Sequence, residues 1–297
     1  LHEHDKYNGS LRARKSFFAI ENRVICLGSD IENSLEGAEV HTTLFQNYIG
    51  PEGEKTQSAY MNERGDILRD GRMDIYFLRG AKAECIRGLQ HSLHEESDAP
   101  TEGYFEKAYI NHGDIVKDGR YEYMLFMPVT TDEVKFVFDE VALETYSQNL
   151  PYTVIRHDSS VHGIEDHKTG IRAFAVFEDG AVDSKILNSS AGMLMYSGED
   201  ESMTLSVSNP DLAMYEGPSD EKFDKEGRRI ERSVYGRKWI DNPCAETEIT
   251  VTVKGLWKIE SNKCCNVTAT HADGNTTLIF QSMEGRTEEI TLKSIML

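Results

Sequence analysis

The sequence predicts an all-β fold built from antiparallel strands in two successive blocks. Short stretches rich in β-branched and aromatic residues recur at roughly 8–12-residue intervals, the spacing typical of β-sandwiches. Turn dipeptides such as Asp70-Gly71 and Asp118-Gly119 are each followed by a strand-like stretch. Hydrophobic residues at 39% and aromatic residues at 9% over 297 residues are enough for a sizeable core, which excludes a disordered chain.

The first block opens with a hairpin. Lys15–Ile20 and Arg23–Leu27 are apolar stretches on either side of the short turn Glu21-Asn22. Only Thr131–Leu143 shows helical periodicity, with Thr131 placed to cap a single short helix. Further strands are expected at Val40–Ile49, Met73–Leu78, Tyr121–Val129, Tyr152–Arg156, Ser160–Glu165 and Ile171–Phe177.

The second block follows the turn Asp179-Gly180, and we place a domain boundary near residue 183, giving domains 1–183 and 184–297. Its clearest strand is Thr247–Val253, where aliphatic residues alternate with threonines and predict one buried face. The other strands are expected at Met193–Tyr196, Met203–Ser208, Asn266–Ala269, Thr276–Gln281 and Glu289–Leu292.

The charge balance restricts the partners. With 32 Lys+Arg against 51 Asp+Glu, the net charge of −19 repels nucleic acid and anionic membranes at long range. The longest apolar runs, such as Met124–Val129, are far shorter than the ~20 residues of a membrane helix. We therefore expect neither nucleic acid nor membrane as a partner. Any polyanion must bind at a local basic cleft or on another part of a larger protein.

No self-contained catalytic or metal motif is present. The sequence lacks a GxSxG nucleophile motif and a glycine-rich phosphate loop, so no catalytic residue is assigned. The five cysteines form no CxxC pair, and the ten histidines lack the spacing of zinc ligands, so no metal site is expected. Two basic clusters stand out against the acidic background: Arg12-Ala-Arg14-Lys15, and Lys222–Lys238, which lies beside Trp239.

Several stretches resemble, in order, the chondroitin ABC lyases of polysaccharide lyase family eight. The similarity covers most of the chain, and the ordered set is more specific than any single motif. The stretches are Ala13-Arg-Lys-Ser-Phe-Phe-Ala, Leu27-Gly-Ser-Asp-Ile31, Val40-His-Thr-Thr-Leu-Phe-Gln46, Pro100-Thr-Glu-Gly103, Tyr121-Glu-Tyr-Met-Leu-Phe126 and Asn209-Pro-Asp-Leu212.

The resemblance implies a large antiparallel β-supersandwich of the galactose-mutarotase-like type over 1–183, followed by a smaller C-terminal β-sandwich over 184–297. It also implies a secreted or periplasmic lyase that cleaves chondroitin or dermatan sulfate by β-elimination at the uronic acid. In this family a preceding helical toroid carries the catalytic His, Tyr and Arg, and no such region occurs in this chain. We therefore expect a fragment that is inactive alone and needs that domain as its partner.

Three residues are predicted to contact the substrate: Arg14, His41 and Gln46, of which His41 and Gln46 lie in a family-like strand. No cofactor is expected in this chain, although the resemblance leaves open a divalent cation such as calcium or magnesium in the complete enzyme. The preferred glycosaminoglycan, endo or exo cleavage and the oligomeric state are not predicted.

Two alternatives of another class stay open. The chain could be a non-catalytic carbohydrate-binding or structural β-module, because β-sandwiches host many unrelated functions. For sugar stacking, Trp239 is the better candidate, because Trp257 follows a strand and is expected in the core. A plain interaction domain is the third interpretation, and only the ordered series of stretches argues against it.

Overall fold

The computed structural model describes residues 10–50, 59–94, 97–198, 200–211, 222–223, 229–230, 246–263 and 266–295. The chain forms two compact units, Leu1–Lys168 and Thr169–Leu297, which are described one at a time. The all-β prediction is confirmed. A division of the family domains near residue 183 stays a prediction.

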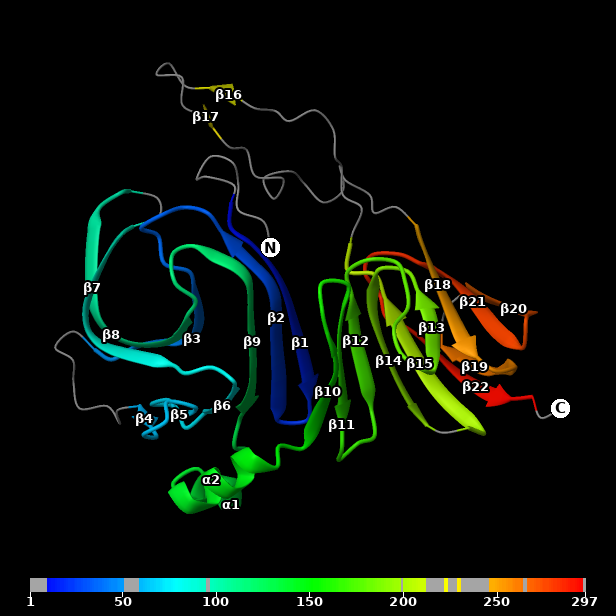
Figure 1. The fold of residues 1–297 in the computed structure, drawn as a ribbon, viewed down its shortest axis with the longest axis horizontal. Helices are drawn as coiled ribbons and strands as arrows, with labels where there is room; N and C mark the ends of the chain where they lie inside the picture. The colour runs from blue at the N-terminus through cyan, green and yellow to red at the C-terminus, as the bar shows by residue number, and fades with distance from the viewer. Residues whose placement is uncertain are drawn as a thin grey trace. The chain divides into compact units, whose positions relative to one another are not determined.

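The first unit is built around a six-stranded antiparallel sheet in the order β1-β2-β9-β6-β5-β4 (Figure 1). The predicted opening hairpin is confirmed, because β1 and β2 pair antiparallel across Glu21-Asn22. The strands are β1 (Arg12–Ile20), β2 (Arg23–Asn33), β4 (Tyr60–Met61), β5 (Ile67–Arg69), β6 (Ile75–Arg79) and β9 (Val116–Phe126).

A three-stranded sheet covers one face of this central sheet. It has the order β3-β8-β7, with β3 (His41–Tyr48), β7 (Glu84–Leu93) and β8 (Pro100–Asn111). Phe45 and Ala108 of the smaller sheet share a buried cluster with Cys26 and Tyr76 of the central sheet. This apolar contact fixes β3 and β8 and leaves their other face available to solvent.

The opposite face of the central sheet packs against the hairpin β10 (Tyr152–His157) and β11 (Val161–Asp166), and against two helices. The helices α1 (Thr131–Phe136) and α2 (Glu140–Gln148) replace the single helix expected over Thr131–Leu143. The break follows from capping: Asp139 adopts extended backbone and accepts a hydrogen bond from the Ala142 amide, which starts a new helix. The first cap is Thr130, in a capping box with Glu133, instead of Thr131.

The second unit contains two antiparallel sheets. One includes β12 (Arg172–Val176), β14 (Gly192–Gly198), β15 (Ser202–Ser208), β22 (Glu288–Ser294) and β19 (Trp257–Lys263), in that order. The other has β13 (Ile186–Ser189), β18 (Thr247–Lys254), β21 (Asn275–Ser282) and β20 (Asn266–Ala272). A short ladder joins β16 (Lys222–Phe223) to β17 (Arg229–Ile230).

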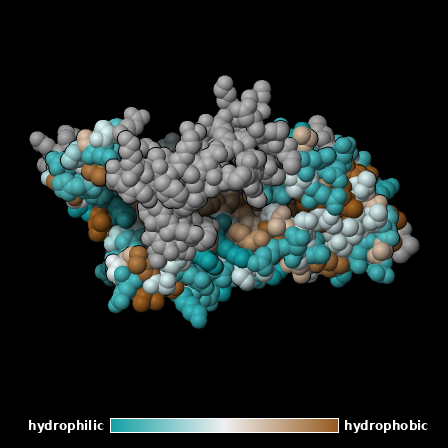
Figure 2. Space-filling view, turned by 90° about the horizontal axis from the view of Figure 1, so that it is seen from above, coloured by the Kyte–Doolittle hydropathy of each residue, from teal (hydrophilic) through white to brown (hydrophobic). Residues whose placement is uncertain are grey.

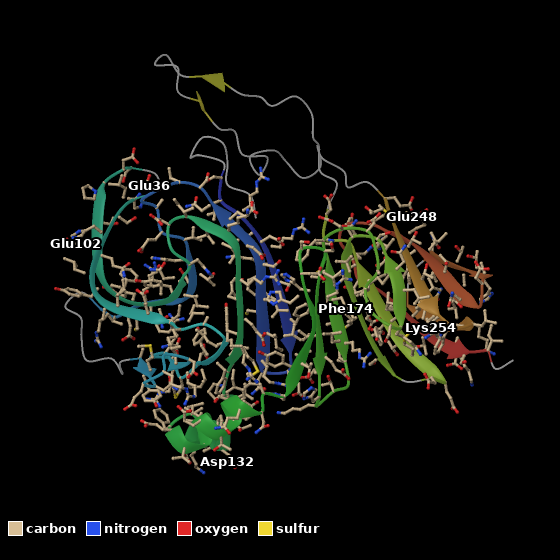
Figure 3. All side chains as sticks on the ribbon, viewed as in Figure 1. Glu36, Glu102, Asp132, Phe174, Glu248 and Lys254 are labelled. Atoms are coloured by element: carbon tan, nitrogen blue, oxygen red, sulfur yellow. The ribbon has the colours of Figure 1, made fainter. Side chains whose placement is uncertain are left out.

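The core of the second unit follows the sequence pattern. Ile249, Val251 and Val253 of β18 are buried, which confirms the predicted alternation. Trp257 is buried, as expected, and Phe174 lies in the interior (Figure 3). Every strand predicted in the second block is present.

The surface agrees with the acidic composition. Hydrophilic residues dominate the described part of the face in Figure 2, with apolar groups scattered between them. Among the described residues, no helix is both long and apolar enough to cross a membrane.

A buried ion pair joins two layers of the first unit. Arg23 of β2 and Asp166 of β11 are both fully buried, and their Nη1 and Oδ1 atoms lie 2.6 Å apart. A second guanidinium nitrogen reaches Glu21 at 2.9 Å. Removing one partner of such a pair leaves an uncompensated charge away from water, which costs more than the pair contributes.

We predict that Asp166→Leu destabilises the fold by about 3–5 kcal/mol, because Arg23 loses its buried carboxylate partner and keeps, among the described residues, only the exposed Glu21. The double variant Arg23→Met/Asp166→Leu should recover much of this loss, because both charges are gone. Urea unfolding of the three proteins measures the effect. A double variant as unstable as the single one would contradict the explanation.

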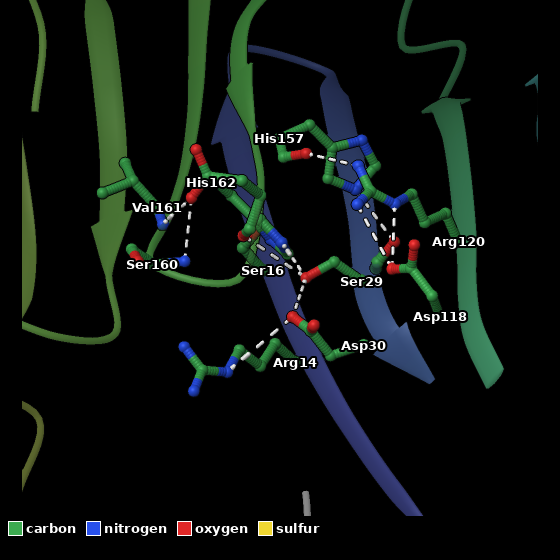
Figure 4. Close-up of polar contacts among 12 residues, drawn as sticks. Arg14, Ser16, Ser29, Asp30, Asp118, Arg120, His157, Ser160, Val161 and His162 are labelled. Carbon is green, nitrogen blue, oxygen red and sulfur yellow. Dashed lines mark hydrogen bonds and ion pairs between the residues drawn. The ribbon is translucent and has the colours of Figure 1, made fainter. Parts of the chain in front are cut away.

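A buried histidine makes a second polar link between the same layers (Figure 4). His162 of β11 meets the Ser16 hydroxyl at 2.8 Å through Nδ1 and the Ser29 hydroxyl at 2.9 Å through Nε2. Because Ser29 donates to Asp30, Nε2 donates to Ser29 and Nδ1 accepts from Ser16, as in a neutral ring. Burial, then the nearby charge of His157, lowers the pKa of His162 to about 4.

This pKa predicts a loss of stability in acid. Between about pH 6.5 and 4 the unfolded chain protonates His162 and the folded chain does not, so unfolding becomes easier as the pH falls. The full loss is on the order of 3 kcal/mol and is complete below pH 4. Urea unfolding of His162→Gln between pH 7 and 4 should show a weaker dependence on pH. An unchanged dependence would exclude His162 as its source.

Candidate polysaccharide-binding surface

Two of the three predicted contact residues lie on one sheet face. In the β3-β8 ladder, Gln46 is opposite Lys107, and Thr43 is opposite Tyr109. Residues that pair across an antiparallel ladder point to the same side, so Gln46, Lys107 and Tyr109 share a face. It is opposite to the face that carries the buried Phe45 and Ala108. We call it the polar face.

His41 belongs to this face through its contact with Tyr109. The two rings stack with centroids 4.0 Å apart and planes 20° apart. Lys107 covers the same tyrosine, with Nζ 4.8 Å from the ring centroid. The Tyr109 hydroxyl donates to Glu84 at 3.0 Å, and this bond raises the pKa of the tyrosine. His41 also meets Glu39, with Nε2 and Oε2 3.1 Å apart.

Basic side chains of β1 and β3 influence His112, the residue that follows β8, whose lowered pKa favours its neutral form. Burial lowers the pKa of His112, and the charges of Lys15 and His41 lower it further. His112 is held by a 2.9 Å hydrogen bond to Thr42. Within the described residues, neither Lys15 nor Lys107 forms an ion pair. We call Lys15, His41, Lys107 and His112 the basic cluster.

Further along the polar face, amide and aromatic groups follow. Gln46 Nε2 donates to Gln90 Oε1 at 2.8 Å, across the middle strand of the sheet. The rings of Tyr48 and Phe105 meet edge to face, with centroids 5.5 Å apart and planes 60° apart. Tyr48 is exposed. This combination of amides, a cation and an exposed ring is suited to binding an anionic sugar chain.

Arg14 lies elsewhere. It pairs with Ser29 across the β1-β2 ladder, so it is on the face of the central sheet that carries Ser16 and His162. Its Nε is 3.9 Å from Asp30 Oδ2 (Figure 4). The structure therefore brings His41 and Gln46 together and leaves Arg14 on the opposite side of the central sheet.

The sequence pointed to β3 but missed its neighbours. No strand was expected at β7 or β8, so the sequence did not point to Lys107, Tyr109 or Phe105, and Tyr48 carried no signal of its own within the expected strand Val40–Ile49. The signal was present in the alternation of Phe105, Lys107 and Tyr109 after Gly103. It was weak because much of β7 is exposed on both faces and carries no apolar periodicity.

The hairpin of β7 and β8 ends in an open hollow of about 520 Å³, lined by His91, Ser92, Leu93, Pro100, Thr101 and Glu102. Glu102, near the start of β8, is labelled in Figure 3. His91 Nδ1 and Glu102 Oε2 are 3.4 Å apart and both side chains are exposed. The hollow lies at the end of the β7-β8 hairpin, where the residues of both strands are exposed.

The remaining candidates from the sequence are the second basic cluster, the metal sites and the cysteines. Trp239 and all of Lys222–Lys238 lie outside the residues whose side chains the structure describes. Within the described ranges, no three His, Cys, Asp or Glu side chains gather in a way that could hold a metal ion. Cys26 and Cys85 are free thiols, and burial raises the pKa of both.

Comparison with known proteins places this geometry in a family. The family model "Polysaccharide lyase family 8, super-sandwich domain" matches residues 2–136. The model "Polysaccharide lyase family 8, C-terminal beta-sandwich domain" matches residues 153–213. Together they cover more than half of the chain.

Similar proteins agree. The chain is 34% identical over 299 residues to a chondroitin sulfate ABC exolyase of Bacteroides thetaiotaomicron, covering 99% of this chain and 28% of that protein. It is 35% identical over 279 residues to a chondroitin sulfate ABC exolyase of Proteus vulgaris, covering 87% of this chain and 26% of the relative. The chain thus spans about a quarter of the length of these relatives.

A solved structure supports the fold. The chondroitin AC lyase of Streptomyces coelicolor A3, in complex with chondroitin sulphate, aligns with a TM-score of 0.64 at 15% identity, covering 97% of this chain and 33% of that one. At this identity the alignment speaks for the fold only. From the two domain models and the exolyase relatives, we conclude that this chain belongs to polysaccharide lyase family 8.

Proposed function

We propose that this chain is the C-terminal β portion of a secreted or periplasmic glycosaminoglycan lyase that cleaves chondroitin or dermatan sulfate. The proposal is supported by family membership and by two relatives named chondroitin sulfate ABC exolyases. In it, the polymer is cut by β-elimination at the uronic acid, and the principal catalytic residues belong to a helical domain outside this chain.

Within this chain, the basic cluster is the observation that supports the proposal most directly. A net charge of −19 repels a sulfated polymer, so a binding surface needs cations that are not neutralised by neighbouring carboxylates. Lys15 and Lys107 meet this need among the described residues. Their ammonium groups would neutralise sulfate or carboxylate groups of the chain.

The chemistry explains why charge neutralisation matters. β-Elimination removes the proton on the carbon next to the uronate carboxylate, and the electron pair then expels the glycosidic oxygen at the neighbouring carbon. Neutralising the carboxylate makes that proton more acidic, and an acid must protonate the leaving oxygen. We assign no acid or base to this chain. Its part is to hold the polymer, with Arg14, His41 and Gln46 kept as proposed contacts.

A second candidate function is a carbohydrate-binding module without catalysis. The exposed Tyr48 beside the amide pair of Gln46 and Gln90 favours it, because these groups bind sugars without any acid or base. The two functions differ in whether a longer protein that includes this chain produces unsaturated uronate.

The first test measures unsaturated uronate formed from chondroitin sulfate by this chain alone and by a protein that also contains the relatives' preceding region. We expect product only from the longer protein. Product from the chain alone would show that catalytic residues lie within it. No product from a correctly folded longer protein would exclude the lyase and leave the binding module.

The basic cluster makes a second prediction. Lys15→Gln/Lys107→Gln should weaken binding of chondroitin sulfate to the chain by roughly tenfold at low salt and reduce the salt dependence of the affinity. The matched control is Lys117→Gln, an exposed lysine of β9 outside the cluster, which should have little effect. Isothermal titration calorimetry at several salt concentrations measures both quantities. Equal losses in the two variants would exclude a localised site.

A further inference from the structure

We propose that the polar face contains a sugar-stacking subsite centred on Tyr48, which holds one pyranose ring of a glycosaminoglycan while Lys107 pairs with an acidic group of the same chain. The proposal rests on the proposed function for the class of polymer. It adds a binding site on this chain that is separate from the chemistry of cleavage.

The tyrosine ring is exposed and held in place. Tyr48 is 58% exposed although it lies in a strand, and Phe105 supports it edge to face from the neighbouring strand. The glycine at 103 makes this packing close: a Cβ there would lie 3.1 Å from both rings. The ring is therefore oriented before any ligand binds, which lowers the entropic cost of binding.

The same row of the sheet ends in open space. Tyr48, Phe105 and Gly88 lie opposite one another across β3, β8 and β7. A Cβ at Gly88 would meet no atom within 4 Å. The row thus offers two aromatic rings and, at Gly88, backbone with open space above it, against which the edge of a sugar ring can lie.

Polar groups surround this row. Gln46 lies two residues before Tyr48 and Gln90 two residues after Gly88, on opposite sides of the row, and their amides bond across it at 2.8 Å. Each amide keeps further donor or acceptor capacity for hydroxyl or acetamido groups of a sugar. Lys107 is two residues from Phe105 on the same face of β8, about 7 Å away. Its ammonium carries the charge complementary to a uronate or sulfate.

These features favour a sugar over a protein segment. On the polar face, the exposed Tyr48 ring is bordered by the amides of Gln46 and Gln90 and by Lys107, while the exposed Ile86 lies opposite Lys107 on β7. Sugars stack their C–H faces on such rings and satisfy their hydroxyls on amides. Although the chain as a whole is acidic, Lys107 is a local positive charge that can pair with an anionic group of a sugar at short range.

The test measures the affinity of the chain for size-defined chondroitin sulfate oligosaccharides by isothermal titration calorimetry. We expect Tyr48→Ala to weaken binding at least about fivefold, and Tyr48→Phe, which keeps the ring, to stay within twofold. The matched control is Phe17→Ala, since Phe17 of β1 is 62% exposed and lies outside the polar face. An unchanged affinity in Tyr48→Ala, or an equal loss in Phe17→Ala, would overturn the subsite.

A steric variant tests the same site without removing a ring. Gly88→Val places a β-branched side chain in the open space of a strand, so the melting temperature should stay the same or rise. Binding should fall at least about fivefold. Full binding by a folded Gly88→Val protein would overturn the placement of the ring beside Gly88.

The outcomes separate this inference from the proposed function. If the lysine variants lose binding and the Tyr48 variants do not, the subsite fails while a polyanion-binding lyase portion stands. If Tyr48→Ala loses binding to sulfated and desulfated oligosaccharides alike, and the longer protein forms no unsaturated uronate, the lyase fails and the sugar site stands. A chain that binds no oligosaccharide overturns the subsite, and the uronate assay then decides on the lyase alone.

Discussion

The buried contact of Arg23 with Asp166 is the constraint on which the first unit depends. It lies where β2, the second strand of the central sheet between β1 and β9, meets β11. An ion pair in the interior is directional, because only one arrangement of the two groups avoids an isolated charge. The pair therefore favours one placement of the β10-β11 hairpin on the central sheet, which apolar packing alone would specify less sharply.

With that layer fixed, the opposite face of the central sheet supports the smaller sheet and its polar face. Phe45 and Ala108 anchor β3 and β8 by burial, while the residues that alternate with them stay free to meet a ligand. Because successive side chains of a strand point to opposite faces, β3 and β8 each contribute to the core on one face and to the binding surface on the other. The basic cluster takes Lys15 from β1 of the central sheet and His41 and Lys107 from β3 and β8 of the smaller sheet, so both sheets contribute to it.

Much of the fold could be predicted, because it depends on alternation and turns. The opening hairpin, the second-block strands and the buried Trp257 all follow from local pattern. The helix was harder, because only the capping role of Asp139 shows that it divides. Of the candidate site, His41 and Gln46 came from the resemblance. Tyr48 and Lys107 become site candidates only once β8 is placed beside β3. The sequence did not predict that sheet, because β7, the other neighbour of β8, has no apolar pattern.

Exposure of β7 on both faces also bears on how such proteins diversify. Its side chains over much of the strand are not packed in the core, so most replacements there cost little folding free energy. Core strands such as β2 have no such freedom, because their volume is fixed by their neighbours. A lineage could therefore retune which sugar decoration it prefers through drift in this one strand, while the scaffold beneath stays unchanged.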